Sequence, residues 1–437
     1  MTPIRLAADI GGTFTDLALE ADGELYTAKV LTTPLEPATA VLEGVERVLA
    51  DAALTPQDVD IFVHGTTLAT NALIERRGAR TALLTTAGMR DSIEMAHENR
   101  FEQYDLAMVR PDPLVPRDLR IGISERLASN GTVLKSLDRG AVHNAVEHLK
   151  ALEVESVAIG FLHSYLNSDH ETQTAEIVQS QWPEVTVSLS SEVCPEIREY
   201  ERFSTTCANA YIQPLLTRYL RDLEARRRAL GMGCPMLLMQ SGGGLGTLED
   251  ALQFPVRLVE SGPAGGALLS AELARSFDID QALSFDMGGT TAKLCIINDG
   301  QPRTSREFEV GREYRFLAGS GLPLRLPVIE MVEIGAGGSS VARLDELGRV
   351  AVGPQSAGSE PGPACYGRSG SEPTVTDADV ALGRILPEGF STGDLNFSKD
   401  AAVAAINDKL VNAGGFDPST AALAITETVD ENMASAG

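Results

Sequence analysis

The chain has 437 residues, of which 43% are hydrophobic and 22% are charged, and its formal net charge is -25. This length predicts two or three domains, and the acidic charge repels nucleic-acid backbones, so we expect no nucleic-acid partner. No apolar run is long enough for a membrane span or a signal peptide, and none of the five cysteines forms a C-x-x-C pair. We therefore expect a reduced, cytoplasmic protein without a disulfide framework or a zinc site.

In the first part of the chain, segments with the hydrophobic spacing of helices alternate with segments that have the spacing of strands. Apolar residues recur at helical spacing over 37–52, and a second helix is expected over 68–77 with Gly78 as its stop. Asp22-Gly23 is a hairpin turn between two of the strands. The expected strands are 4–8, 17–20, 24–30, 60–64 and 80–85.

The middle of the chain continues this alternation. We expect a helix over 169–181 capped by Ser168, and a long helical tract over 196–229 that Pro214 interrupts. Further strands are expected at 156–162, 185–190 and 236–240. Strands alternating with helices, with antiparallel hairpins first, predict a mixed α/β architecture.

One loop occurs twice in the sequence. Residues 9–16 (DIGGTFTD) and 286–293 (DMGGTTAK) share the core D-x-G-G-T, and each lies between two predicted strands, followed by an Asp-Gly turn. A single copy could equally be an ordinary hairpin turn or a phosphate loop. Two copies with matching flanks indicate a pair of phosphate loops that clamp a polyphosphate.

The residue types in these loops suit that chemistry. Paired glycines let main-chain N–H groups approach an anion without a Cβ in the way, and threonine hydroxyls donate to phosphate oxygens. The leading Asp9 and Asp286 make sense beside phosphates when a cation lies between, so we assign both to Mg²⁺. The sequence has no G-x-x-x-x-G-K-S/T loop and no dinucleotide-type G-x-G-x-x-G after a strand.

These two loops resemble the phosphate loops of the actin–hexokinase–heat-shock ATPase superfamily. Other segments narrow the resemblance to the hydantoinase A/5-oxoprolinase family, and it covers nearly the whole chain. The segments are 64–73 (HGTTLATNAL), 261–266 (SGPAGG), 333–339 (EIGAGGS), 356–367 (SAGSEPGPACYG) and 373–379 (PTVTDAD). The chain departs from the family at 337–340, which read Gly-Gly-Ser-Ser where many relatives carry three glycines.

The resemblance implies an α/β fold with two pseudo-symmetric ribonuclease-H-like domains, whose mixed sheets surround a nucleotide cleft as in actin-like ATPases. We place the first domain at 1–190 and the second, with the second phosphate loop, at 191–437. A helix is predicted over 418–435 and no closing strand follows it, so we expect the second domain to be incomplete.

The implied function is ATP-dependent hydrolysis of a cyclic amide such as a lactam, a hydantoin or 5-oxoproline. This chain would bind ATP and phosphorylate the amide, and a hydantoinase B-type subunit or domain would complete the hydrolysis within a hetero-oligomer. The alternative is a subunit of an ATP-dependent carboxylase that acts on acetone or acetophenone. A nucleotide-switched scaffold on the same fold is a third hypothesis.

Several residues are candidates for this site. His64 ends a strand before a helix and could serve acid–base chemistry or hold substrate, with a structural role as the alternative. Lys293 is either a phosphate counter-charge or a solvated strand residue. The expected ATP-binding residues are Gly11, Gly12, Thr13, Thr15, Gly65, Thr66, Thr67, Gly288, Gly289, Thr290, Thr291, Lys293, Gly337 and Gly338.

For several other polar residues and glycine-rich segments, a structural role or a place in the lining of a cleft is the interpretation to weigh against catalysis. Glu196, Arg198, Glu199, Glu201 and Arg202 are dense enough to suggest catalysis, but a solvated, salt-bridged helix face explains them better. Cys365 lies in a Gly-Pro-rich loop, and nothing nearby in the sequence would lower the pKa of its thiol. The segments 241–244 (SGGG) and 261–263 (SGP) follow strand ends and could line a cleft.

Overall fold

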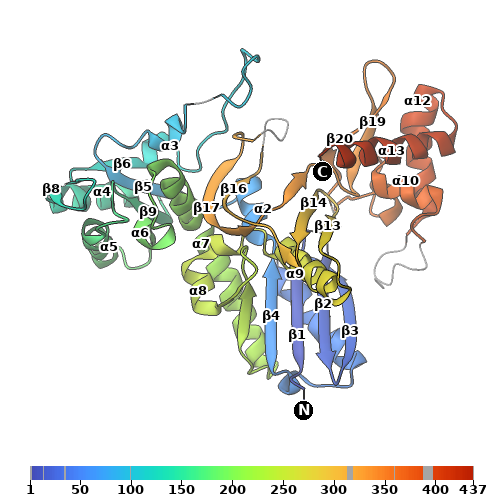
Figure 1. The fold of residues 1–437 in the computed structure, drawn as a ribbon, viewed down its shortest axis with the longest axis horizontal. Helices are drawn as coiled ribbons and strands as arrows, with labels where there is room; N and C mark the ends of the chain where they lie inside the picture. The colour runs from blue at the N-terminus through green and yellow to red at the C-terminus, as the bar shows by residue number, and fades with distance from the viewer. Residues whose placement is uncertain are drawn as a thin grey trace.

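The structure is a computed structural model that describes residues 2–12, 14–33, 36–98, 100–312, 318–358, 360–386 and 397–436. Its helices and strands form three groups (Figure 1). A central sheet near the N-terminus lies between an α/β unit on one side and a third group that contains the C-terminal helices. The mixed α/β architecture expected from the sequence is therefore present.

The central sheet has six strands in the order β12-β11-β4-β1-β2-β3. β1 pairs with β2 antiparallel and with β4 parallel, and α1 (Pro37–Asp51) packs Val41, Val45 and Val48 into the core of this group. The alternation of buried and exposed positions along β2 reflects a sheet with one covered face. The strands are β1 (Arg5–Ile10), β2 (Phe14–Ala21), β3 (Glu24–Leu31), β4 (Ile61–Thr66), β11 (Met236–Met239) and β12 (Leu245–Thr247).

The central sheet takes strands from both sides of residue 190. β11 pairs in parallel with β4, although the α/β unit separates them in sequence. The ranges 1–190 and 191–437 therefore do not correspond to separate sheets, because a strand far along the chain from β4 completes the first one.

The inserted α/β unit is built on a parallel sheet with the order β10-β9-β5-β6. β5 and β9 are buried throughout, as expected for parallel strands covered on both faces. Two helices, α4 (Arg139–Ala151) and α5 (Asp169–Gln181), add their apolar residues to this core. The strands are β5 (Thr81–Thr86), β6 (Arg120–Ile123), β9 (Ser156–Gly160) and β10 (Thr186–Leu189).

The long helix α7 (Glu199–Ala229) connects the inserted unit to the central sheet. The expected interruption at Pro214 is wrong, because the helix continues through this residue. Contacts at both ends hold it: the guanidinium of Arg202 donates to the carbonyls of Phe161 and Glu196, and that of Arg227 donates to the carbonyl of Met232. Arg202 is fully buried, so the expectation of a solvated charged face also fails here.

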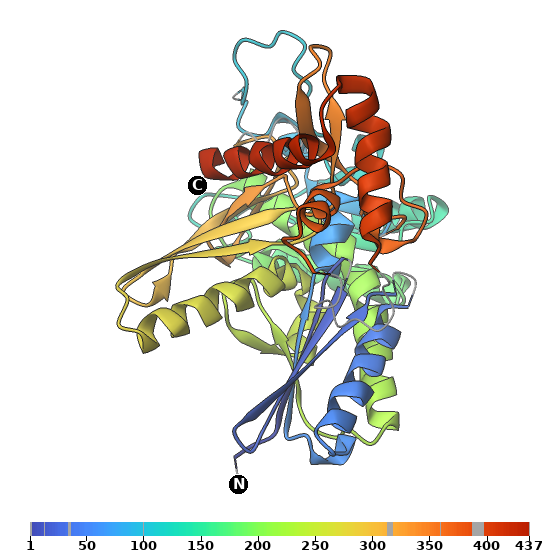
Figure 2. The same ribbon diagram turned by 90° about the vertical axis from the view of Figure 1, so that its right-hand side faces the viewer.

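The third group carries the second copy of the repeated loop. β13 (Gln281–Met287) and β14 (Ala292–Asn298) form a hairpin, and α9 (Ser261–Ser276) lies along it, as Figure 2 shows. The core of this group lies between β14 and the C-terminal helix α13 (Pro418–Ala436). Its other elements are β15 (Gln301–Pro302), β16 (Thr304–Val310), β17 (Leu322–Ile329), β18 (Val332–Ile334), β19 (Ser340–Leu344), β20 (Val350–Ser356), α10 (Val375–Leu382) and α11 (Lys399–Ile406).

The two D-x-G-G-T loops form hairpins of the same register. Asp9 is opposite Asp16 in the first hairpin, and Asp286 is opposite Lys293 in the second. Each turn is closed by the same bond, since Gly11 N–H donates to the carbonyl of Phe14 and Gly288 N–H donates to that of Thr291. The duplication read from the sequence is thus confirmed at the level of backbone pairing.

Within the described part of the chain, no helix combines the length and apolarity that crossing a membrane requires.

Candidate functional site

Asp9, at the end of β1, lies where three elements meet. The end of β4 and the start of α9 both approach its carboxylate so closely that only glycine fits. A Cβ on Gly65 would lie 2.5 Å from Asp9 Oδ1, and a Cβ on Gly262 would lie 2.9 Å from Asp9 Oδ2. Both glycines are therefore required by close approach of the backbone to this carboxylate.

The carboxylate of Asp9 is poorly compensated. Its Oδ1 is sealed from solvent and has no hydrogen-bond partner among the described residues. Burial, with a smaller contribution from the charges of Asp16 and Asp286, raises the pKa of Asp9 to about 6, and Lys29 acts in the opposite direction. The contribution of Asp286 means that the two hairpins bring their leading aspartates within electrostatic reach of each other.

The second hairpin is covered by the loop that joins β18 to β19. Gly338 N–H donates to the carbonyl of Gly288 at 3.0 Å, and Ser339 N–H donates to that of Gly289 at 2.6 Å. A Cβ on Gly337 would lie 2.6 Å from the carbonyl oxygen of Gly289, so this position also requires glycine. The structure therefore brings the expected residues Gly288, Gly289, Gly337 and Gly338 together.

The last serine of the 337–340 segment has a local role. Ser340 Oγ accepts a hydrogen bond from Gly337 N–H at 2.9 Å, which closes the loop on itself. Thr376 N–H then donates to the carbonyl of Gly338 at 2.8 Å, so α10 anchors the loop from the other side.

Several expected ligand residues instead hold the backbone together. Thr15 is fully buried with its Oγ1 3.1 Å from Thr32 Oγ1, and Thr66 Oγ1 accepts from Leu68 N–H. Thr67 Oγ1 donates to the carbonyl of Ile10 at 3.0 Å, which joins the start of α2 (Leu68–Ile74) to the end of β1. The O–H groups of Thr15 and Thr67 are occupied within the protein, which corrects their assignment as phosphate donors, and Thr66 is withdrawn from the surface by burial.

The remaining expected residues of the loops differ in exposure. Gly12 and Thr290 are exposed, and Gly11 and Thr291 are half-buried, so their groups are open to a ligand. Thr13 lies outside the described residues.

His64 is buried inside the central sheet. Because a carbonyl only accepts, the 3.0 Å contact with Ala8 places the proton on Nδ1, and Nε2 accepts from the hydroxyl of Tyr219 at 2.7 Å. Burial lowers the pKa of His64 to about 4, so the ring is neutral near pH 7. With both nitrogens bonded and no exposed surface, the ring has no free group for acid–base chemistry or for substrate, which corrects that assignment.

Lys293 is neither free for phosphate nor solvated. Its Nζ forms an ion pair with Glu260 and lies 3.9 Å from Glu333 Oε1, and the side chain is 13% exposed. Lys293 therefore compensates two carboxylates on neighbouring segments, which corrects both interpretations of this residue. Glu260 precedes α9 with a φ of 61°, a left-handed conformation that is strained for a residue other than glycine.

Two of these partners were not detectable from the sequence pattern. Tyr219 lies on α7, far from His64 along the chain, and Glu260 immediately precedes the SGPAGG segment without belonging to it. The glutamate at 333 begins one of the family-like segments, and Gly262 lies in one of the segments that could line a cleft.

The carboxylates of Asp9 and Asp286 are suitable ligands for a hard divalent cation that also binds a polyphosphate. Asp9 offers a buried carboxylate oxygen that no described residue pairs with, and Asp286 is an exposed carboxylate within its electrostatic reach. Mg²⁺ commonly takes one or two carboxylates together with substrate phosphates rather than a complete protein cage. In the described ranges, no group of three or more His, Cys, Asp or Glu is arranged to hold a metal ion, in keeping with this kind of site.

A separate cavity of about 580 Å³ lies between α7, the β16–β17 hairpin and the segment 110–114. Its lining includes Glu333, the residue that faces Lys293. Cys365 does not belong to this cavity, and burial raises the pKa of its thiol, in keeping with a structural role for this residue.

Comparisons with known proteins all point to one protein family. Residues 5–182 match the hydantoinase/oxoprolinase N-terminal region, and residues 202–436 match the hydantoinase/oxoprolinase profile. Caprolactamase subunit alpha of Pseudomonas jessenii is 36% identical over 99% of this chain and 62% of its own length. Acetophenone carboxylase gamma subunit of Aromatoleum aromaticum is 33% identical over 98% of this chain and 60% of its own length.

Solved structures agree. Nucleotide-free acetone carboxylase matches with a TM-score of 0.84 and 25% identity, over 99% of this chain and 62% of that one. The ATP-dependent caprolactamase of Pseudomonas jessenii matches with a TM-score of 0.78 and 34% identity over the same shares. The chain spans less than two thirds of the length of these relatives. It belongs to the hydantoinase/oxoprolinase family.

Proposed function

We propose that this chain binds ATP between its two D-x-G-G-T hairpins and uses it to activate the amide of a small cyclic substrate. One observation carries the proposal above the others. The buried Oδ1 of Asp9 lacks a partner among the described residues and lies against two glycine-bearing backbone segments, while a second hairpin of identical register brings Asp286 into electrostatic reach. Such a site is short of positive charge and is satisfied by a cation held against phosphates.

In this proposal Asp9 and Asp286 hold Mg²⁺, which supplies charge compensation for the polyphosphate. The N–H groups of the two Gly-Gly turns bind phosphate oxygens, as backbone amides without a Cβ can do. The start of α9 beside Asp9 adds the positive end of a helix dipole. His64 and Tyr219 hold β1 against β4 and α7, and so act as positioning residues.

We also propose that the two hairpins belong to the two halves of an actin-like ATPase fold. Equal register and equal turn bonds in β1–β2 and β13–β14 support a pseudo-symmetric origin. The two family profiles divide the chain between residues 182 and 202, which supports a sequence boundary near 190 even though β11 crosses back to the first sheet.

The substrate we propose is a cyclic amide, because one of the similar proteins is a caprolactamase and others are 5-oxoprolinases. Transfer of the γ-phosphoryl group to the amide oxygen releases ADP and makes that oxygen a leaving group. Water can then add at the carbon of the phosphorylated amide, and proton transfer to the ring nitrogen allows the C–N bond to break, which opens the ring. The acyl phosphate that remains is hydrolysed by a second water molecule to the carboxylate and inorganic phosphate. This is how ATP overcomes the low reactivity of an unstrained amide.

Completion of the hydrolysis is assigned to a second, hydantoinase B-type subunit in a hetero-oligomer. Several similar proteins are themselves named as subunits, which supports this proposal. The described residues near Asp9 contribute carboxylates and backbone groups but no nucleophile bonded to a base, and the His64 ring that sequence reasoning offered is already occupied.

The alternative function, an ATP-dependent ketone carboxylase, is favoured by the TM-score of 0.84 with acetone carboxylase. Product analysis separates the two. The purified chain with its copurifying partner is supplied with ATP and either a lactam or a ketone with bicarbonate. An open-chain amino acid supports the amidohydrolase, a carboxylated ketone supports the carboxylase, and ATP hydrolysis indifferent to both would support a nucleotide-switched scaffold.

A further inference from the structure

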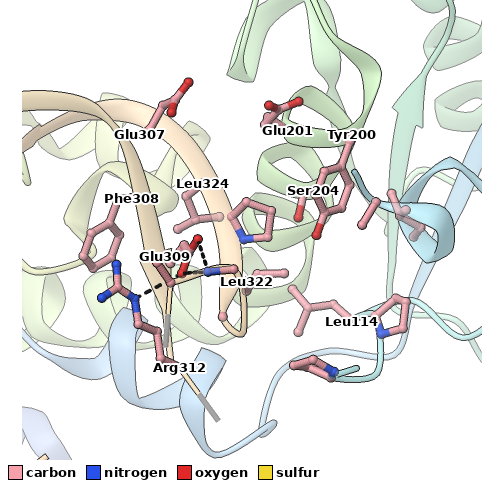
Figure 3. Close-up of a pocket in the computed structure, with 18 of the residues that line it drawn as sticks. Leu114, Tyr200, Glu201, Ser204, Glu307, Phe308, Glu309, Arg312, Leu322 and Leu324 are labelled. Carbon is pink, nitrogen blue, oxygen red and sulfur yellow. Dashed lines mark hydrogen bonds and ion pairs between the residues drawn. The ribbon is translucent and has the colours of Figure 1, made fainter. Parts of the chain in front are cut away.

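The cavity beside α7 has one polar wall and one apolar wall. Tyr200, Glu201 and Ser204 lie on the α7 side, and the leucines of the opposite side come from β17 and the segment 110–114 (Figure 3). In Figure 3 the side chains of Tyr200 and Ser204 point from α7 toward the leucines across the cavity. These leucines are Leu114, Leu322 and Leu324.

Glu201 is a buried acceptor without a full set of partners. The residue is 7% exposed, its Oε1 lies 3.4 Å from His97 Nε2, and its Oε2 has no hydrogen-bond partner among the described residues. Other carboxylates that line the cavity are paired, since Glu307 meets Arg325 and Glu309 meets Arg312. A buried carboxylate oxygen without a donor is costly, so its persistence here points to a donor supplied by a ligand.

The same wall offers hydroxyl donors next to this acceptor. Burial raises the pKa of Tyr200 to about 12, so its phenol keeps its proton. Thr205 and Thr206, on the neighbouring faces of α7, donate to carbonyls one turn back. No equivalent bond is found for Ser204 in the described ranges, although it is buried, so its hydroxyl is available to the cavity.

We propose that this cavity recognises a small ring with a secondary amide, an inference that rests on the proposed function and assigns a place in the fold and a specificity-determining residue, Glu201, to its substrate. The amide N–H donates to the carboxylate of Glu201, its carbonyl accepts from Ser204 or Tyr200, and the ring methylenes lie against the leucines. The cavity extends to Glu333, which faces Lys293, and Lys293 lies opposite Asp286 in the second hairpin. One end of the site is thus next to the phosphate loops.

Recognition through Glu201 separates amides from ketones. A ketone satisfies the hydroxyl donors but leaves the carboxylate without a partner, and an N-methylated lactam does the same while adding a methyl group. A site with a buried polar group of this kind discriminates strongly against ligands that cannot form a hydrogen bond with that group.

The test uses ε-caprolactam and N-methylcaprolactam as probes, with dissociation constants measured by ligand-observed NMR on the full chain without nucleotide. We expect the N–H lactam to bind about tenfold or more tightly than the N-methyl lactam, the range of a hydrogen bond to a charged group. Glu201→Leu is expected to abolish this preference by weakening only the N–H lactam. Glu201→Gln retains an acceptor oxygen and should lose less.

Glu147→Leu is the matched control, because Glu147 lies on α4, outside the lining of the cavity, and its side chain is 66% exposed. It should leave the preference unchanged, and circular dichroism should show both leucine variants folded. Equal binding of the two lactams by the unaltered chain, or an unchanged preference in folded Glu201→Leu and Glu201→Gln, overturns the inference. The proposed function fails separately, when lactam binds this cavity yet neither stimulates ATP hydrolysis nor is opened in the presence of the partner.

Discussion

The two hairpins have the same loop and the same register, yet their surroundings differ. β1 is flanked by β2 on one side and β4 on the other, whereas β13 pairs with β14 alone in the part of the chain that is described. Asp9 consequently has an oxygen sealed from solvent, and the equivalent Asp286 is exposed. The same motif therefore produces one aspartate with a strongly raised pKa and one that water can still solvate.

The apolar side chains of the two hairpins also differ in burial. Leu6, Ala8 and Leu19 of the first hairpin are almost completely buried in the central core. The equivalent positions of the second are Leu283, Phe285 and Ile296, which are 61%, 51% and 46% exposed. A residue type suited to a core is thus present in both hairpins, but packing covers it in only one, so the hairpin sequence alone does not fix the environment of its aspartate.

The largest expected effect tests whether the hairpins act as a pair. Asp9→Ala and Asp286→Ala should each lower substrate-dependent ATP hydrolysis by about a hundredfold or more, because each removes charge compensation from the polyphosphate. Steady-state kinetics with circular dichroism as the folding control would measure this. Near-normal activity in a folded Asp286→Ala would show that only the first hairpin works on phosphate.

A different loss is expected from the glycines of the turns. Gly12→Val and Gly289→Val place a side chain where phosphate meets the backbone, so ATP binding itself should fail. Calorimetric titration with Mg-ATP separates this outcome from the aspartate variants, which should lose kcat. Unchanged affinity in both valine variants would contradict phosphate contact at the turns.

The difference in burial predicts that neutralising the two aspartates has unequal effects on stability. The folded pKa of Asp9, about 6, lies above the value near 3.9 expected for an unfolded chain, so the folded state binds the extra proton. Stability should therefore fall as pH rises from about 4 through 6, and Asp9→Asn should remove this fall and raise stability at pH 7 by up to about 3 kcal/mol.

Asp286→Asn is the matched control, and it should change stability by less than about 0.5 kcal/mol because its carboxylate is exposed. Thermal unfolding between pH 4 and 7.5 without nucleotide or Mg²⁺ would compare the two. A folded Asp9→Asn that is less stable than the unaltered chain at pH 7 would mean that Asp9 has a partner at rest.

Close packing around Asp9 predicts a smaller stability effect at Gly65. Gly65→Ala places a Cβ 2.5 Å from Asp9 Oδ1 and should cost about 1–3 kcal/mol, as overpacking does. Gly266→Ala, inside α9 with nothing within 4 Å of the new Cβ, should instead be neutral or stabilising by up to about 1 kcal/mol. Urea unfolding of both variants measures the contrast, and equal stability would show that β4 can retreat from Asp9.

The smallest expected effect concerns His64. Tyr219→Phe removes the hydroxyl that donates to His64 Nε2 and should cost about 1 kcal/mol, with kcat changed by less than about threefold. Thermal unfolding and steady-state kinetics check the two parts. A large loss of kcat in a stable Tyr219→Phe would restore an acid–base role for His64.

Features that depend on neighbouring residues could be predicted from the amino-acid sequence. Each repeated loop, 9–16 and 286–293, is eight contiguous residues whose backbone bonds close within the segment, so the equivalence of Asp9 and Asp286 is visible in the sequence itself. Most strands and helices of the first 190 residues follow from hydrophobic period for the same reason, although β6 and α4 of the inserted unit were not among the expected elements. The family follows from the combined segments.

The surroundings of these residues, by contrast, depend on tertiary contacts. The burial of Asp9 depends on Gly65 and Gly262, the pairing of Lys293 depends on Glu260 and Glu333, and β11 joins a sheet begun at the N-terminus. Glu201 could be interpreted only as part of a charged helix, because spacing along the helix does not reveal which face a distant hairpin covers. Desolvation and ion pairing depend on segments that are far apart in the chain, and the local sequence does not show which distant segments will come into contact.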